Sequence, residues 1–237
     1  MDDETGPAEL LLATCTRDLG DPDLWITPDG YPDSLALCLI DSIYSTGAHY
    51  TSVLNVVRNY RDYRRTQAAN ADSDGAPELL TTIGELGGPD GWATKVGNRR
   101  PTSTAPGAPL KAAAIASAAE TLVELGIETT SELRAAAANG QIDAVKQAWR
   151  RVPGQRSGLT WEYALMLAQI PGVKADRMVI RYTARAIGLP ESQLSAKRAN
   201  ELVRRVAEVK GWNIIHTDHA IWRFESGRQV SREADPI

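Results

Sequence analysis

Apolar residues recur at intervals of three and four positions along most of this 237-residue chain. That spacing places them on one face of an α-helix, whereas strands would show apolar and polar residues in alternation. No alternating run of strand length occurs. The pattern therefore predicts an all-α protein.

Several segments satisfy the helical pattern. They are residues 35–40, 51–65, 110–125, a short stretch after 129, 142–151, 159–170, a stretch from 176 that stops before 188, 196–209 and a last short helix from 218. Asp33 is the expected cap of the first, and Thr129 with Glu132 has the spacing of a capping box. Glycine and proline interrupt the pattern at 71–77, 87–90 and 100–109, and the last of these is expected to be a mobile surface loop.

The chain is long enough for one large domain or for two lobes, each with its own core. Its longest apolar run, residues 35–40, is far too short to span a bilayer. The start Met-Asp-Asp-Glu lacks an apolar signal region, which favours a cytoplasmic location. Cys15 and Cys38 cannot build a four-thiolate cluster, and each is interpreted as a small buried apolar residue.

The formal net charge of -4 is unevenly distributed. Residues 1–35 hold nine acids and one base, so the remaining 202 residues carry 25 bases and 21 acids. Binding of phosphate depends on where the cations lie rather than on their total. The candidate basic clusters are Lys95, Arg99 and Arg100; Lys146, Arg150, Arg151 and Arg156; and Lys174, Arg177 and Arg181. Taken alone, each cluster is most simply a solvated helix face.

The most informative segment is residues 152–181. It reads Val-Pro-Gly-Gln-Arg-Ser-Gly, continues with a helical run and closes with Pro-Gly-Val-Lys-Ala-Asp-Arg-Met-Val-Ile-Arg. This order resembles the helix-hairpin-helix DNA glycosylase superfamily, in which a Leu-Pro-Gly-Val-Gly hairpin precedes a helix and a Val-Asp-x-His-Val-x-Arg sequence follows. The hairpin is matched by Val152, Pro153 and Gly154, and the second motif by Asp176, Val179 and Arg181. Weaker similarity extends the resemblance to roughly residues 37–222.

The resemblance implies a two-lobed helical fold. One lobe would be a bundle over residues 36–170 that ends in the hairpin, and the other would combine residues 1–35 with 171–237. The cleft between the lobes would hold Asp176, the DNA and a nucleotide flipped out of the stack, because the bond to be cut is buried in a duplex. We expect a monomer that binds DNA and no membrane.

In such a hairpin, main-chain N–H groups of a tight turn bind a DNA phosphate, and the next helix N-terminus adds positive potential. The residues predicted to bind DNA are Gly154, Gln155, Arg156, Ser157, Gly158, Arg177 and Arg181. The resemblance is compatible with K⁺ or Na⁺ at the turn, and it implies no other cofactor and no iron–sulfur cluster, since no Cys follows residue 38. For the hairpin taken alone, a plain connection between two helices is the alternative.

Asp176 is the predicted catalytic residue. An aspartate at a helix N-terminus is most often a cap, which stabilises the helix by about 1 kcal/mol. Cleavage of an N-glycosidic bond, however, develops positive charge on the sugar, and a carboxylate can stabilise that charge and orient water. Members of the superfamily that also cut the DNA strand carry a lysine at the position of Gly158, and neither Ser157 nor Thr160 can form an imine. The sequence therefore predicts a monofunctional glycosylase that leaves an abasic site.

The base pocket is predicted from Tyr44, Gly47 and Trp161. Gly47 stands where relatives have a space-filling Gln, and together with Gly158 it suggests room for a bulky base such as the glucosylated hydroxymethylcytosine of viral DNA, an antiviral role. Tyr44, Tyr50 and Trp161 are candidates to stack on the base, with core packing as the alternative. Damaged or alkylated purines remain open as substrates.

Two departures set this chain apart. Met178 stands where the superfamily often has His, and Gln155-Arg156 replaces Val-Gly in the hairpin, so either Arg156 binds phosphate directly or the turn is less rigid. His216 and His219 lack a third strong metal ligand, and no metal site is predicted; a helix cap at Asp218 with surface imidazoles is the simpler interpretation. The alternatives to the enzyme are a catalytically inactive DNA-binding module and a helical protein–protein adaptor.

Overall fold

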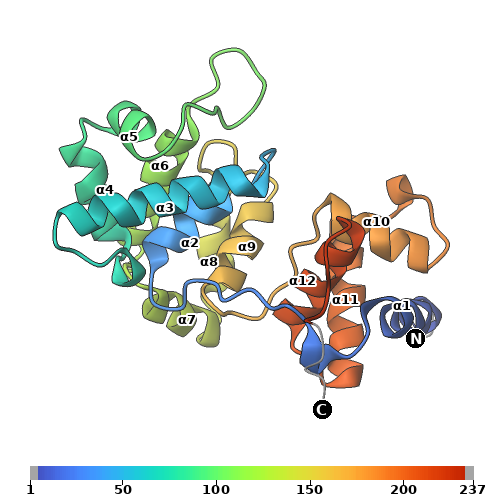
Figure 1. Cartoon of the computed structure of the whole chain (residues 1–237). Helices are drawn as coiled ribbons and strands as arrows, with labels where there is room; N and C mark the ends of the chain where they lie inside the picture. The colour runs from blue at the N-terminus through green and yellow to red at the C-terminus, as the bar shows by residue number, and fades with distance from the viewer. Residues whose placement is uncertain (1–4, 233–237) are drawn as a thin grey trace. The chain divides into compact units, whose positions relative to one another are not determined.

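The computed structural model describes residues 5–232 and consists of α-helices joined by turns and short 3₁₀ segments (Figure 1). Within this part of the chain there are two isolated antiparallel bridges but no strand. The all-α class is thereby confirmed. Residues 1–4 and 233–237, which the prediction assigned to the second lobe, lie outside the described residues.

The α-helices in chain order are α1 (Thr5–Leu19), α2 (Leu35–Tyr44), α3 (Tyr50–Thr66), α4 (Ala76–Glu85), α5 (Pro89–Lys95), α6 (Lys111–Glu124), α7 (Thr130–Ala138), α8 (Ile142–Trp149), α9 (Leu159–Leu167), α10 (Arg177–Ala186), α11 (Ala196–Lys210) and α12 (Ile214–Glu225). Single 3₁₀ turns lie at η1 (Pro22–Leu24), η2 (Ala71–Ser73) and η3 (Glu191–Gln193). The capping box of Thr129 and Glu132 and the cap at Asp176 are confirmed.

Several predicted helix borders are wrong, each for a local reason. Ser34 rather than Asp33 caps α2, with its hydroxyl accepting from Leu37 N–H. Helix α9 stops at Leu167 instead of 170, because Gln169 adopts a left-handed conformation with φ 62° and Pro171 follows. Helix α12 starts at Ile214 with Asn213 as its cap, four residues before the predicted start.

The chain forms two compact units. Unit 1 contains residues 1–29 and 171–237, and unit 2 contains residues 30–170. The sequence had placed the first border between 35 and 36. Residues 30–34 belong with unit 2 because Tyr31 N–H donates to Leu167 O at 2.7 Å and the Tyr31 hydroxyl donates to Asp41 at 2.9 Å.

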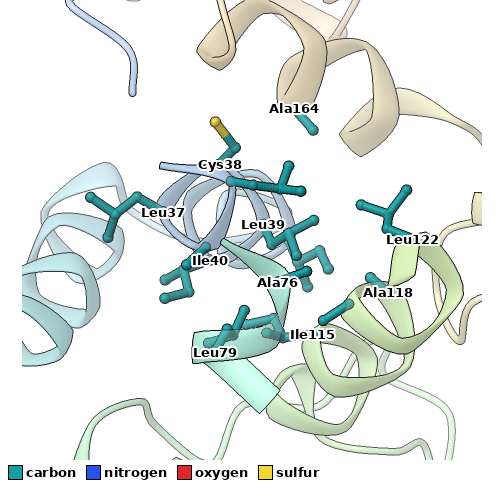
Figure 2. Packing of buried hydrophobic residues seen from close by; sticks show 14 of the residues in the cluster. Leu37, Cys38, Leu39, Ile40, Ala76, Leu79, Ile115, Ala118, Leu122 and Ala164 are labelled. Carbon is teal, nitrogen blue, oxygen red and sulfur yellow. The ribbon is translucent and has the colours of Figure 1, made fainter. Parts of the chain in front are cut away.

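Helix α2 is the centre of unit 2. Every residue from Leu35 to Tyr44 is buried, since α3, α4, α6 and α9 surround it. In Figure 2, Leu37, Leu39 and Ile40 point in different directions from α2, toward side chains from the surrounding helices. A helix that is apolar all round is stable in water only when other elements cover all its faces.

Lys111 satisfies the C-terminal end of this buried helix. Its Nζ donates to Tyr44 O at 3.0 Å and to Thr46 O at 2.5 Å, and it lies 5.7 Å from the centre of the Tyr44 ring. Burial, with a smaller contribution from the charge of Arg100, lowers the pKa of Lys111 to about 8. The residue therefore provides hydrogen-bond donors for carbonyl groups that a helix end leaves unsatisfied.

Unit 1 has a separate core. The faces of α10, α11 and α12 pack together and against α1, with residues such as Leu11, Val179, Leu202 and Ile221 inside. Val209 was expected on the apolar face of α11 but is 66% exposed. Cys15 lies in this core and Cys38 in that of unit 2, and both are free thiols, as the interpretation of buried apolar residues required.

Replacement of Lys111 by methionine should destabilise unit 2. Methionine keeps the apolar stem but leaves Tyr44 O and Thr46 O without their donor, and we expect the free energy of unfolding to fall by about 2 kcal/mol. Urea unfolding measures the loss. The exposed Lys95→Met is the control, expected within about 0.5 kcal/mol of the unsubstituted protein; equal effects of the two substitutions would contradict this role.

Candidate functional site

The predicted hairpin exists in unit 2 as α8, a tight turn over residues 150–158, and α9. Gly154 and Gly158 both have left-handed backbones, with φ of 78° and 76°, a region that other residues rarely adopt. At Gly154 a Cβ atom would also lie 2.6 Å from Cβ of Thr102. This turn therefore requires glycine at 154 for two independent reasons.

Gln155, which replaces the usual apolar residue, braces the turn from inside. Its side chain is buried, its Nε2 donates to Pro153 O at 3.0 Å, and its Oε1 accepts from Thr160 Oγ1 at 2.5 Å. Thr160 in turn accepts from Trp149 Nε1 at 3.0 Å. The turn is thus tied to both helices by a polar chain, and the Gln155 side chain is a structural brace rather than the predicted contact to DNA.

The outer side of the turn presents main-chain donors. The N–H groups of Gly154, Arg156 and Ser157 form no hydrogen bond within residues 5–232, and all three residues are exposed. Adjacent unpaired N–H groups of this kind bind anions. Unpaired N–H groups on exposed residues are compatible with the predicted phosphate contact, which stays a prediction.

Basic side chains surround the same turn. Arg151 and Arg156 are exposed and have no ion-pair partner in the described part of the chain. Arg150 is instead used internally, since its Nε donates to Arg156 O at 2.8 Å. Lys146 pairs with Glu162 of α9 at 2.5 Å.

Lys146 also lies beside Gly158, where bifunctional relatives carry their lysine. A Cβ atom at Gly158 would be 3.6 Å from Lys146 Cε. The sequence had found no substitute near this position, because Lys146 lies twelve positions earlier, on the other arm of the hairpin. Its Nζ forms an ion pair with Glu162, which engages the amine of this lysine.

Asp176 lies in unit 1 at the start of α10 and is half-buried. Its Oδ1 accepts from Met178 N–H at 2.8 Å and from Val179 N–H at 3.3 Å. Its Oδ2 accepts no hydrogen bond within the described residues. One oxygen is therefore fixed by the helix end, and the other can face a ligand.

The two predicted arginines of α10 differ. Arg177 is exposed, and it has no ion pair among the described residues. Arg181 forms an ion pair with Glu225 of α12 through Nε, and its guanidinium also donates to Glu225 O at 3.3 Å. Arg181 thus joins α10 to α12, and its side chain stays 41% exposed, so its contact with DNA remains a prediction.

Asp218 was interpreted as a helix cap, and this is wrong. Asn213 caps α12, and Asp218 lies in the interior of that helix and is buried. Burial and the charge of Asp176 raise the pKa of Asp218 well above its usual range. The neighbouring His219 stacks on Trp222 at 5.7 Å, and burial, helped by nearby cations, lowers its pKa to about 4.

The prediction that Tyr44 and Trp161 line a base pocket is wrong. Tyr44 and Trp161 are each 1% exposed: Tyr44 donates its hydroxyl to Asn98 O at 3.1 Å, and Trp161 packs on Trp149 at 5.3 Å. Both are core residues, so neither offers a ring face to a base. Gly47 is exposed, and a Cβ atom there would meet nothing within 4 Å.

An aromatic cluster, of which the sequence indicated only Tyr50, lies elsewhere in unit 2. Tyr31, Tyr50 and Tyr163 are half-buried around the fully buried Asp41. Tyr31 donates to Asp41, and Tyr50 and Tyr163 interact through their hydroxyl groups. Tyr163 lies more than 100 positions after the other three, so its place in the cluster depends on how the helices pack.

No group of three or more His, Cys, Asp or Glu residues in the described part of the chain is arranged to hold a metal ion. Across residues 5–232, none of the helices combines the length and the apolar character needed to traverse a bilayer.

Comparison with known families assigns the chain to one of them. Residues 9–226 match the family model of a domain of unknown function, DUF8548. The chain belongs to the DUF8548 family. The match covers both units, and so includes the hairpin, Asp176 and Asp218. No curated protein and no solved structure matches the chain.

Arg156→Ala should weaken binding to DNA regardless of its sequence. Loss of one phosphate contact lowers the slope of log affinity against log salt by about one. Titration of a labelled duplex at several salt concentrations measures this slope. Arg65→Ala is the matched control, since it removes the same charge from an exposed side chain of unit 2 that pairs with Asp62. An unchanged slope for the Arg156 variant would exclude a phosphate contact there.

Proposed function

We propose that the protein is a monofunctional DNA N-glycosylase, which hydrolyses the N-glycosidic bond of a modified base flipped out of DNA and leaves an abasic site. The observation that carries this proposal is the state of Asp176. The helix end fixes one of its carboxylate oxygens, the other has no partner in the described residues, and the side chain is only half-buried. Eight residues of chain join α9 of the hairpin to this carboxylate.

The chemistry follows from that arrangement. The two N–H bonds to Oδ1 hold the plane of the carboxylate, which leaves Oδ2 to act on the sugar. As the base departs, the sugar acquires oxocarbenium character, and a fixed negative charge stabilises it without reorganisation. The same oxygen can orient or deprotonate the attacking water.

The hairpin supports DNA as the partner. Its three unpaired N–H groups suit one phosphate, and Arg151 and Arg156 add positive charge that reads no base sequence. The turn also has main-chain carbonyl oxygens, the donors that K⁺ and Na⁺ take. Val152 O and Gln155 O each accept one N–H within the turn and keep a second lone pair, so K⁺ or Na⁺ at the turn stays part of the proposal. A monomer in the cytoplasm stays our prediction.

For the substrate we propose a bulky modified base, with the glucosylated hydroxymethylcytosine of viral DNA as the leading example. The open space at Gly47 supports this choice. Gly158 supports it less than the sequence suggested, since Lys146 lies against that position. Repair of damaged or alkylated purines is the other substrate class to test.

A DNA-binding module without catalysis is the second candidate. The observation in its favour is that Asp176 is a complete helix cap, and a cap alone explains its position. The two candidates differ only in whether Oδ2 does chemistry.

Asp176→Asn separates the two. The amide oxygen still accepts from Met178 and Val179, so the fold and DNA affinity should change by no more than about twofold, while the rate of base excision falls about 10²–10⁴-fold. Abasic sites are revealed by alkaline cleavage after incubation with a panel of modified DNAs that includes viral genomes with hypermodified cytosine. Asp21→Asn, at another capping aspartate of unit 1, is the control with full activity. Wild-type protein that binds DNA yet makes no abasic site on any panel member would favour the module.

Borohydride should trap no covalent adduct between the protein and DNA. Lys146, which lies beside Gly158, has its Nζ in an ion pair with Glu162, and an imine requires a free amine. Gel mobility of labelled substrate after reduction is the measurement. An adduct that forms with wild type and disappears in Lys146→Met would show that Lys146 replaces the missing lysine and that the enzyme is bifunctional.

A further inference from the structure

Asp218 is a buried acid whose position in the core of unit 1 needs an explanation. Its residue is 5% exposed, and its Oδ1 has no hydrogen-bond partner. An ionised carboxylate in such a place costs several kcal/mol, and the usual outcome is that the group stays protonated. The pKa of Asp218 is raised well above its usual range. Burial is the larger cause, and the like charge of Asp176 is the second.

Asp218 is connected to Asp176 through the main chain of Lys174. The Lys174 N–H donates to the Asp218 carboxyl group. The Lys174 carbonyl oxygen accepts the N–H of Asp176 at 2.6 Å. Asp218 of α12 therefore holds the N–H of Lys174, and the carbonyl group of the same residue holds the N–H of the proposed catalytic residue.

The same short segment is held from α11 as well. Asn200 Nδ2 donates to Val173 O at 2.8 Å, and Arg204 donates to Pro171 O at 3.3 Å. A helix cap needs only its own side-chain oxygen and the N–H groups of the first turn. The bonds to residues 171–174 fix the approach to Asp176 beyond what a cap requires.

We propose that Asp218 is a positioning residue for Asp176, and that the two carboxyl groups work as a pair in which Asp218 keeps the proton and Asp176 carries the charge. This inference rests on the proposed glycosylase function. Asp218 itself is too deeply buried to touch the substrate, so it acts through the Lys174 main chain and through its own neutrality. Were both acids ionised, their repulsion would displace the carboxylate that faces the sugar.

Several other charged groups on the packed elements form ion pairs, whereas Arg177 of α10 is exposed and has no ion pair among the described residues. Arg181 and Arg185 of α10 pair with Glu225. On α1, Arg17 pairs with Asp18, and Cys15 interacts with Tyr182. On α12, the charges acting on His219 are those of Arg223, His216 and Arg228. The charges that act on Asp218 are those of Asp176 and Lys174.

The first experiment separates positioning from folding by steady-state kinetics on the modified DNA that the wild type cleaves. Asp218→Asn retains an acceptor for Lys174 N–H, and kcat should stay within about threefold of wild type. Asp218→Ala lacks the acceptor, and kcat should fall about 10–100-fold while the dissociation constant for DNA is unchanged, because the phosphate-binding turn belongs to unit 2. Thr217→Val, at a buried polar side chain of the same helix that bonds only to Asn213 O, is the control for general damage to α12. An alanine variant that folds with wild-type kcat, or an asparagine variant as slow as alanine, would overturn the proposal.

The second experiment needs no activity. Carbon-13 NMR of the aspartate carboxyl groups follows the titration of Asp218 in wild type and in Asp176→Asn. We expect the Asp218 pKa to fall by about one unit when the charge at 176 is removed. If Asp218 titrates identically in both proteins, the proposed pairing of the two carboxyl groups is wrong even if the enzyme is active. A clear shift in a protein that never makes abasic sites would retain the pair and reject the glycosylase.

Discussion

The complete burial of α2 is the constraint on which unit 2 depends. Because all ten residues from Leu35 to Tyr44 are inside, other helices must cover every face, and α9 is one of them. The core of unit 2 therefore fixes the position of the hairpin, because α9, its second arm, packs on α2 through residues such as Ala164 (Figure 2). The same burial makes Lys111 necessary, since a helix that ends inside the protein needs donors for its last carbonyl groups.

The hairpin shows how a sequence can depart from a motif and keep its geometry. An apolar residue at 155 would hold the turn by packing alone. Gln155 holds it instead through Pro153 O, Thr160 and Trp149, and each polar atom in this chain has a partner. A buried polar network is stabilising only when its members are satisfied, and it then fixes one arrangement. The exchange leaves the outer face of the turn free for anions.

Local signals predicted much of the fold. The spacing of Val53, Val56, Val57 and Tyr60 identified α3, and the pair Thr129–Glu132 identified the start of α7. The prediction missed α4 and α5 because Gly75, Pro77 and Pro89 were interpreted as breaks, whereas the prolines occupy the first turns of helices, where no N–H is needed. It also missed α1, whose apolar residues pack on partners near the other end of the chain.

Only part of the candidate site could be predicted from the sequence, because only part of it depends on local features. The positive φ of Gly154 and Gly158 and the cap at Asp176 are local properties, and residue types at fixed spacing report them. Three other contacts depend on how the helices pack, and the spacing of residues along the sequence does not reveal them. They are Lys146 with Gly158, Asp218 with Lys174, and Glu225 with Arg181. Tyr44 and Trp161 were misjudged in the opposite sense, because an aromatic residue near a motif can face either the core or the surface.

In the proposed pair, Asp176 and Asp218 are the same residue type, so the difference between them depends on their surroundings. Asp176 has two N–H donors on one oxygen and lies half-exposed, conditions that suit a charge. Asp218 has one main-chain donor and one unpartnered oxygen and is 5% exposed, conditions that suit a proton. A single carboxylate at a helix end is consistent with a cap. A second carboxyl group, buried at a cost behind the same backbone turn, is not needed for capping, and its presence supports the proposal that Asp176 acts in chemistry as well as in capping.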